Sequence, residues 1–205
     1  MIPPPPILSA GQTVLGLVLA GGRSVRFGGE KAAAILNGKP LLLWATERLT
    51  AVCPAVAVNA RPGTEAERLA GGLMVLHDRP GDPDGPLSGV RAGLEWAAGR
   101  GAGLLAVSPC DAPLLPDDLF PRLIAAAREH GAAVAETPDG PQPQVAVWPV
   151  SALPLLETAL AGGAHPPTWR MLQAAGAHPV RFDDPAAFAN VNTREDLAVL
   201  AARLD

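Results

Sequence analysis

The stretch VLGLVLA at residues 14–20, followed at once by GGRSVRFGGEK at residues 21–31, decides the fold class of this chain. The first seven residues are continuously apolar, which is typical of a strand covered on both faces. The following loop combines four glycines with Arg23, Arg26 and Lys31. Glycines let main-chain amides turn toward a ligand, and long cationic side chains suit phosphates. The stretch therefore predicts a phosphate-binding loop after a buried strand, with an ordinary glycine-rich turn as the alternative.

Apolar runs and helical patterns alternate along the rest of the chain. Further strands are expected at residues 55–59, 73–77, 103–108, 132–135, 144–148 and 179–182. Helices are expected at residues 41–50, 64–70, 87–98, 117–130, 151–161, 168–175 and 192–204. Such alternation predicts an α/β fold with a mostly parallel central sheet and helices on both faces. The Pro- and Gly-rich segments GDPDGP (81–86) and TPDGPQP (137–143) are interpreted as loops.

Length and composition favour a single folded domain. The 205 residues are 48% hydrophobic and carry a formal net charge of −4. We expect one domain at residues 13–205, preceded by a flexible Pro-rich leader at residues 1–12. The mild acidity argues against a nucleic-acid-binding protein, which would show a basic excess. Two cysteines, Cys53 and Cys110, are too few for a disulfide scaffold or a four-thiolate zinc site.

The chain also shows no signal for a membrane or for secretion. No uninterrupted apolar run reaches the roughly 18 residues of a transmembrane helix. The start, MIPPPPILSA, has no cationic segment, and its prolines interrupt any apolar one. A cytoplasmic enzyme or small-ligand binder is therefore expected.

Polar side chains follow three of the expected strands. Asn59 ends the second strand, Asp78 follows the third, and Asp111 comes shortly after the fourth. Ligands of parallel α/β sheets bind outside the carboxyl ends of the strands, so these residues are candidates for the site. From the residues alone, Asp111 is either a Mg²⁺ ligand or a helix cap, and Asp78 either contacts a ligand or forms a turn.

The loop pattern LAGGxSxRFGxxK resembles the signature of nucleotidyltransferases with a Rossmann-like fold. Its Ala-Gly-Gly form resembles the molybdenum cofactor guanylyltransferases. The resemblance continues in order through VNA (58–60), Asp78 with GPLSG (85–89), SPCDAPLLP (108–116), QPQVAVWP (142–149) and NVNT (190–193). The chain departs from the family pattern in GGAHPPTWRML (162–172), where relatives carry an earlier basic run, and in Glu30-Lys31, where Asp-Lys is commoner.

The resemblance implies Mg²⁺-dependent transfer of GMP from GTP to the terminal phosphate of molybdopterin, giving the guanine dinucleotide cofactor and pyrophosphate. It implies catalytic roles for Arg26, Lys31 and Asp111, with Asp111 as the metal ligand. The implied GTP contacts are Leu19, Ala20, Gly21, Gly22, Arg23, Lys31, Asn59, Asp78, Gly85, Pro86, Leu87 and Asp111. The implied contacts to the second substrate are Gln142, Gln144, Arg170, Asn190 and Asn192.

Two other functions compete with this prediction. One is a molybdopterin cytidylyltransferase or another NTP:phosphate transferase, since the choice of base depends on few contacts. The other is a non-catalytic nucleotide-binding accessory protein, which the presence of both Lys31 and Asp111 disfavours. The expected partners are GTP, molybdopterin and, transiently, other molybdenum-cofactor proteins.

Two local patterns complete the sequence analysis. Asn192 and Thr193 stand before Glu195 and Asp196, which predicts a capping box at a helix N-terminus. Cys110 lies among apolar residues with no nearby histidine, so we interpret it as a buried small side chain rather than a nucleophile.

Overall fold

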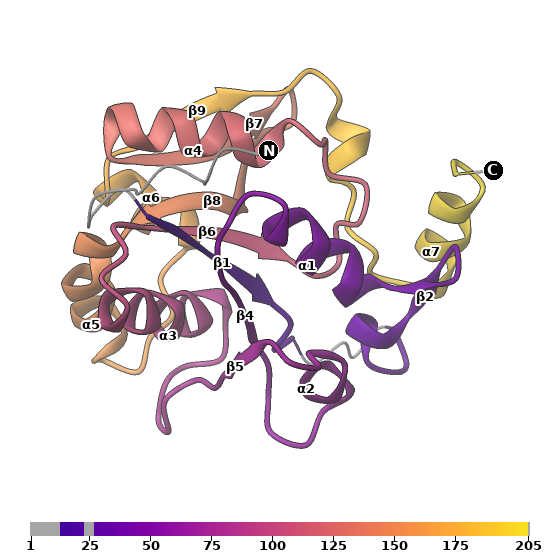
Figure 1. Ribbon diagram of the computed structural model, residues 1–205, viewed down its shortest axis with the longest axis horizontal. Coiled ribbons are helices and arrows are strands. Elements are labelled where there is room, and N and C mark those ends of the chain that lie inside the picture. Colours follow the sequence, from indigo (N-terminus) through magenta and orange to yellow (C-terminus); the bar gives the residue numbers. More distant parts are fainter. Residues whose placement is uncertain (1–12, 23–26, 205) are drawn as a thin grey trace, which may run out of the picture.

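The computed structural model describes residues 13–22 and 27–204. In these residues seven strands form one sheet in the order β5-β4-β1-β6-β8-β7-β9, as Figure 1 shows. The strands are β1 (Val14–Leu19), β4 (Val56–Asn59), β5 (Met74–Leu76), β6 (Leu104–Pro109), β7 (Ala132–Thr137), β8 (Gly140–Pro149) and β9 (Ala177–Arg181). β8 is antiparallel to both of its neighbours, and the other pairings are parallel. The predicted mostly parallel α/β sheet is confirmed.

Helices cover both faces of this sheet, as predicted. Successive residues of β1 point to opposite faces, and both sets are apolar and need cover. Val14 and Val18 join a core cluster with helices α1 (Leu41–Thr50), α2 (Glu65–Leu69) and α4 (Leu119–His130). Leu15 and Leu17 join a second cluster with α3 (Pro86–Gly99), α5 (Leu153–Leu160) and α6 (Thr168–Ala174). The continuous apolar run of β1 is therefore buried on both faces. Short 3-10 helices complete the fold: η1 (Lys31–Ala33), η2 (Val150–Ala152) and η3 (Pro185–Phe188).

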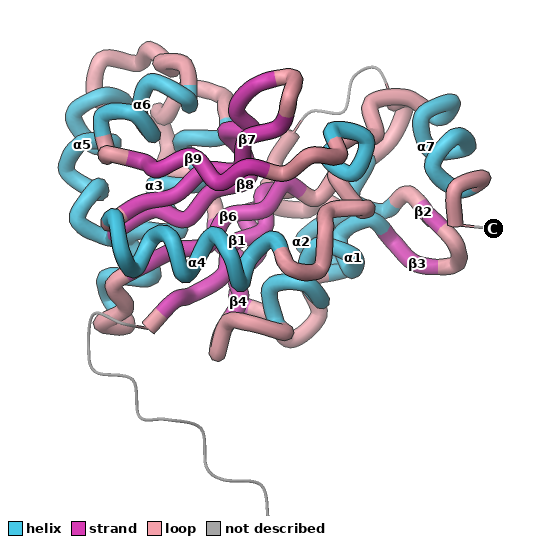
Figure 2. Tube along the Cα trace, turned by 90° about the horizontal axis from the view of Figure 1, so that it is seen from above, coloured by secondary structure: helices cyan, strands magenta, loops and turns pink. Residues whose placement is uncertain are grey.

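A small hairpin that the sequence analysis did not predict projects from one end of the sheet. It consists of β2 (Ile35–Leu36) and β3 (Lys39–Pro40), joined by Asn37 and Gly38 at φ 47° and 76°. Two positive φ angles match a type I′ turn, for which Asn-Gly is the preferred sequence. Helix α7 (Arg194–Ala201) lies beside the hairpin in Figure 2, and its Leu200 shares a buried cluster with Leu36. The far C-terminal segment is thus held against the chain that follows the first loop.

The prediction of a loop at residues 137–143 was wrong. β7 runs to Thr137, and β8 begins at Gly140, whose φ is +113°. β8 pairs with β6 from residue 146 onward, so Pro141 and Pro143 lie where β8 extends past β6 and pairs with β7 alone. Prolines are tolerated at such an edge because no ladder hydrogen bond is lost on the open side.

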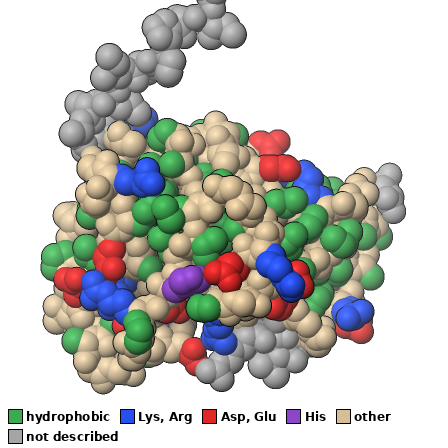
Figure 3. All heavy atoms as spheres, turned by 60° about the horizontal axis from the view of Figure 1, so that its bottom comes forward, with side chains coloured by type: hydrophobic (Ala, Val, Ile, Leu, Met, Phe, Trp, Pro, Cys, Tyr) green, Lys and Arg blue, Asp and Glu red, His purple; other side chains and the backbone are tan. Residues whose placement is uncertain are grey.

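The described surface carries mixed charges. On the face drawn in Figure 3, Lys and Arg side chains alternate with Asp, Glu and apolar ones, and the described residues form no continuous basic stripe there. Within residues 13–22 and 27–204, no helix combines the length and apolarity needed to cross a membrane.

Candidate active site

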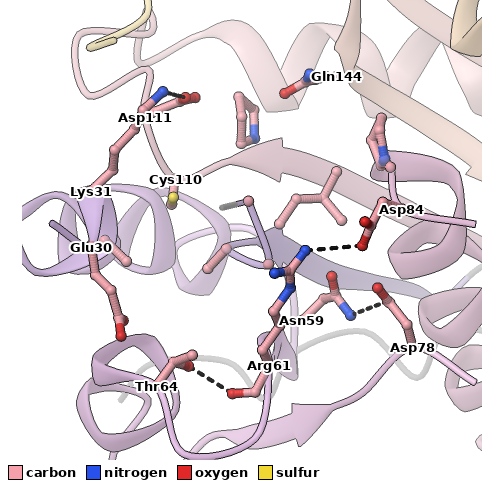
Figure 4. Close-up of a pocket in the computed structure, with 18 residues that line it drawn as sticks. Glu30, Lys31, Asn59, Arg61, Thr64, Asp78, Asp84, Cys110, Asp111 and Gln144 are labelled. Atoms are coloured by element: carbon pink, nitrogen blue, oxygen red, sulfur yellow. Dashed lines mark hydrogen bonds and ion pairs between the residues drawn. The ribbon is translucent and has the colours of Figure 1, made fainter. Parts of the chain in front are cut away.

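A pocket of about 520 Å³ opens at the carboxyl ends of β1, β4, β5 and β6, the edge of the sheet where the sequence predicts the ligand site. The sheet order β5-β4-β1-β6 sets the order of the residues that follow these strands. The side chains drawn in Figure 4 line it: Leu19, Ala20, Gly21, Gly22, Glu30, Lys31, Ala32, Asn59, Arg61, Thr64, Asp78, Asp84, Gly85, Pro86, Pro109, Cys110, Asp111 and Gln144.

One end of the pocket brings together a cation, a carboxylate and an amide from three distant segments. Lys31 begins η1, and its Nζ lies 3.1 Å from Oδ2 of Asp111, which follows β6. The same Nζ donates to Oδ1 of Asn192 at 2.8 Å. Both charged side chains remain partly open to the pocket, with 16% and 20% of their surface exposed. A cation beside a carboxylate in a polar pocket is an arrangement suited to phosphate and metal chemistry.

The other end is formed by Asn59 and Asp78, which Figure 4 shows facing each other. Asn59 is 5% exposed, and its Nδ2 donates to Oδ1 of Asp78 at 2.9 Å and to the carbonyl of Leu76 at 3.3 Å. The buried amide therefore fixes the Asp78 carboxylate at the rim. Space for the Asn59 side chain exists because residue 89 is glycine: a Cβ there would lie 2.3 Å from Oδ1 of Asn59.

Replacement of Gly89 by alanine is expected to weaken nucleotide binding. The added Cβ would also lie 2.8 Å from Cδ2 of Leu19, so the side chains of both Asn59 and Leu19 must shift. Overpacking of this kind typically costs 1–3 kcal/mol, which is about a five- to 150-fold loss of affinity if all of it falls on binding. Calorimetric titration with GTP measures the dissociation constant, and thermal unfolding measures stability.

Gly93→Ala is the matched control for this substitution. Residue 93 lies in the same helix, and a Cβ there would press on Leu17 and Leu105 of the core, away from the pocket. The control should lower the melting temperature and leave GTP affinity unchanged. If both variants weaken GTP binding equally, Gly89 does not act through Asn59.

Several lining residues were not predicted. Arg61 reaches across the pocket to Asp84, with Nη2 3.1 Å from Oδ1, and joins the loops after β4 and β5. Glu30 accepts a hydrogen bond from the amide of Ala66 at 3.2 Å and ties the first loop to α2. A charged residue just after a strand is the sequence signal that points to Arg61, since such positions face the ligand edge. Asp84 lies eight residues beyond β5, in the loop before α3, and carries no such signal.

Two residues of α3 hold the loop that contains Asp84. The guanidinium of Arg91, itself buried, pairs with Asp82. The hydroxyl of Ser88 donates to the carbonyl of Pro83 at 2.7 Å. These two bonds place Asp84 and the following Gly85 at the pocket wall.

The structure brings most, but not all, of the predicted residues to the pocket. Leu19, Ala20, Gly21, Gly22, Lys31, Asn59, Asp78, Gly85, Pro86, Asp111 and Gln144 line it, and Asn192 contacts it through Lys31. Leu87, Gln142, Arg170 and Asn190 are not among the lining residues. Arg23, Arg26 and the expected leader at residues 1–12 lie outside the described residues.

Local contacts account for three of the predicted residues that do not line the pocket. The amide of Leu87 donates to Nε2 of His165 at 3.1 Å, and Leu87 itself is buried. Gln142 donates to the hydroxyl of Thr137 at 3.1 Å within the β7–β8 hairpin. Arg170 is exposed and lies over the ring of Trp169 on α6.

The donor set at Asp111 fits a magnesium ion that is shared with a substrate. Among the described residues, no group of three or more His, Cys, Asp or Glu side chains could hold a metal between them. Mg²⁺ commonly uses one or two protein carboxylates together with substrate phosphates and water. Asp111, open to the pocket on one side, would supply such a carboxylate.

The two cysteines are buried, and their thiols have raised pKa values. Burial raises the pKa of the Cys53 thiol to about 12. Burial and the neighbouring Asp111 carboxylate raise the pKa of Cys110 well above its ordinary value. Both thiols are therefore neutral at physiological pH, and the interpretation of Cys110 as a buried small side chain is confirmed.

We expect a disulfide reagent such as DTNB to leave both thiols of the folded protein unmodified at pH 8, because thiolates are the reacting species. In denaturant both should react within minutes. Rapid reaction of one equivalent in the folded protein would show that Cys53 or Cys110 is ionised or accessible.

Known proteins resemble this chain over most of its length. A model of the MobA-like NTP transferase domain matches residues 16–180. The molybdenum cofactor guanylyltransferase of Cereibacter sphaeroides is 43% identical over 190 residues, which cover 90% of this chain and 94% of that protein. The protein of the same name from Rhodobacter capsulatus is 40% identical over 199 residues, with 93% and 96% covered.

Solved structures share the fold. Molybdopterin-guanine dinucleotide biosynthesis protein A from Archaeoglobus fulgidus superposes with a TM-score of 0.74 at 24% identity, covering 93% of this chain and 98% of that one. The 4-diphosphocytidyl-2C-methyl-D-erythritol synthase of Anaerococcus prevotii gives a TM-score of 0.74 at 13% identity, with 95% and 96% covered. Because these two names differ, the fold alone does not choose the substrate.

Proposed function

The chain belongs to the MobA-like NTP transferase family, and from this membership we propose that it transfers GMP from GTP to molybdopterin. The products are molybdopterin guanine dinucleotide and pyrophosphate. The proposal keeps three further expectations from the sequence: Mg²⁺ as the metal, a cytoplasmic location, and transient contacts with other proteins that handle the molybdenum cofactor.

The observation that carries the proposal is that the two ends of the pocket present different polar groups. Lys31 and Asp111 lie at one end, and Asn59 and Asp78 lie at the other. A nucleoside triphosphate has the same division, with anionic phosphates at one end and hydrogen-bonding ribose and base at the other. We place the phosphates against Lys31 and the glycines of the first loop, and the nucleoside against Asn59 and Asp78.

The reaction is a displacement at the α-phosphorus of GTP. An oxygen of the terminal phosphate of molybdopterin forms a new P–O bond, the bond from the α-phosphorus to the bridging oxygen breaks, and pyrophosphate leaves with the electron pair. The attacking phosphate monoester is largely dianionic at neutral pH, because its second pKa is about 6. It needs no strong general base, and the described lining contains no histidine.

Catalysis therefore depends on position and charge. Two anions must approach each other, so cations and amides that hold both phosphates lower the barrier. Lys31 neutralises charge on the triphosphate and on the departing pyrophosphate. Asp111 would hold Mg²⁺, which when bound supplies Lewis-acid stabilisation of the phosphate oxygens. We assign Gln144, which lies on β8 and lines the pocket, to contact with the second substrate.

Calorimetric titration of the purified protein with GTP, CTP and ATP in the presence of Mg²⁺ tests the nucleotide part of this proposal. GTP should bind at least about tenfold more tightly than the other two, a difference of about 1.4 kcal/mol. Preference for CTP would move the chain to cytidylyl transfer. Absence of binding to all three nucleotides would contradict the assignment of the pocket.

A further inference from the structure

We infer that Asp196 is a positioning residue for the transfer reaction. Its carboxylate holds Asn192 in the orientation in which the side-chain Oδ1 accepts from the ammonium group of Lys31. The inference rests on the proposed function. It assigns a role in the site to α7, a helix that begins fourteen residues beyond the last residue matched by the family model, residue 180.

Asp196 fixes the backbone on either side of Asn192. Its Oδ2 accepts hydrogen bonds from the amides of Asn192 and Thr193, both at 2.8 Å. In return, the hydroxyl of Thr193 accepts from the amide of Asp196 at 3.1 Å, which completes a capping box. The predicted capping box is confirmed. The Asp196 carboxylate also accepts from the amide of Asn192, the residue before the N-cap Thr193.

The residue before Asn192 is fixed to the site itself. The amide of Val191 donates to the backbone carbonyl of Asp111 at 2.8 Å, and the Val191 side chain is fully buried beside Leu36 and Leu200. Residues 191–193 are therefore held at both ends, by the carbonyl of Asp111 and by the carboxylate of Asp196. With its backbone held in this way, Asn192 directs Oδ1 at Nζ of Lys31, 2.8 Å away.

Asp111 and Asn192 differ in charge as acceptors for Lys31, and this difference explains why the orientation matters. The Asp111 carboxylate pairs with the ammonium charge, whereas the Asn192 carbonyl is neutral and binds the ammonium without cancelling it. Asn192 thus helps to hold Lys31 in place without adding a second negative charge beside the ammonium group. Movement of a reacting group by about 1 Å can lower a rate a hundredfold, so loss of this anchor should appear in turnover.

The ionisation of Asp196 supports the same arrangement. The amides of Asn192 and Thr193 donate to its carboxylate and hold its pKa below the ordinary value, with a smaller contribution from the charge of Lys31. Asp196 is therefore ionised throughout the neutral range, where the transfer is assayed.

A role limited to helix stability makes a different prediction, and two variants distinguish the two roles. Asp196→Ala removes the acceptor for Asn192 and Thr193. Thr193→Ala removes the other half of the capping box and leaves those two bonds in place. Both variants should lower the melting temperature. Only Asp196→Ala should lower kcat for GMP transfer, by about tenfold or more, with the KM for GTP changed much less.

A double-mutant cycle then tests whether Asp196 acts through Asn192. In an Asn192→Ala background, Asp196→Ala should cause no further loss of kcat, although the melting temperature should still fall. Asp196→Asn, whose oxygen can accept the same two hydrogen bonds, should restore most of the turnover. If Asp196→Ala is unfolded at the assay temperature, Asp196→Ser takes its place in the cycle.

Two outcomes would overturn the inference: equal losses of kcat in Asp196→Ala and Thr193→Ala, or additive losses of kcat in the cycle. A wild-type protein that transfers no GMP would instead contradict the proposed function, so the two failures are distinguishable.

Discussion

Asp111→Ala is expected to abolish GMP transfer while the fold stays intact. Asp111 lies at the carboxyl end of β6, faces the pocket, and pairs with Lys31 at 3.1 Å. Its loss removes the carboxylate that we assign to Mg²⁺ and leaves the ammonium of Lys31 without this partner. Removal of one transition-state-stabilising group typically lowers kcat by 10²–10³, and loss of the metal as well should exceed about 10³, or about 4 kcal/mol in the activation free energy.

The measurement is kcat/KM for GMP transfer at saturating Mg²⁺, together with the melting temperature. Asp117→Ala is the matched control, because Asp117 lies six residues further on and its fully exposed carboxylate pairs with Arg48 outside the pocket. An ion pair whose carboxylate is in solvent contributes about 0–1 kcal/mol, so the control should retain wild-type activity and nearly wild-type stability. Full Mg²⁺-dependent activity in Asp111→Ala would exclude the metal-ligand role.

Lys31→Ala is expected to produce the second large effect, a loss of about 10²–10³ in kcat/KM with little change in stability. The side chain lies at the pocket wall rather than in the core, and its charge is the one that we place against the triphosphate. Lys31→Arg keeps the charge and should recover part of the activity, although its planar group cannot reproduce both contacts of Nζ.

Lys39→Ala is the control for the loss of a lysine. Lys39 lies on the β2–β3 hairpin and pairs with Glu47 at 2.5 Å outside the pocket. Steady-state kinetics and thermal unfolding of the three variants provide the comparison. Unchanged turnover in Lys31→Ala would remove this residue from the triphosphate site.

The sequence predicted the layered fold because its main signals are local. The apolar runs of β1 and β6 and the amphipathic pattern of α1 each depend on neighbouring residues, and the helix at Leu41–Thr50 is found at its predicted bounds. The order of the strands and the reversed direction of β8 depend on pairing between distant segments, which periodicity does not report.

Two hairpins differ from the sequence prediction although short local signals mark their turns. Asn37-Gly38 is the preferred sequence of a type I′ turn, and here it joins β2 to β3. The prolines at 141 and 143 predict a loop that continues beyond Pro138 and Asp139, but only these two residues separate β7 from β8. Proline excludes a central strand position and remains compatible with an edge.

The site was predictable in its outline for the same reason as the fold. Asn59, Asp78 and Asp111 follow strands, and parallel strands end at one edge, so their convergence was expected. Contacts such as Arg61 with Asp84, or Lys31 with Asn192, join residues 23 and 161 positions apart. Only the three-dimensional structure shows that the C-terminal capping box reaches the first loop.

A transfer assay with labelled GTP tests directly whether this protein transfers GMP to molybdopterin. The purified protein is incubated with molybdopterin, Mg²⁺ and GTP that carries radioactive phosphorus at the α position, and the products are separated. We predict that the label enters a dinucleotide with molybdopterin in proportion to the unlabelled pyrophosphate released, and that CTP does not replace GTP. Absence of label from the dinucleotide, or equal transfer from CTP, would contradict guanylyl transfer by this protein.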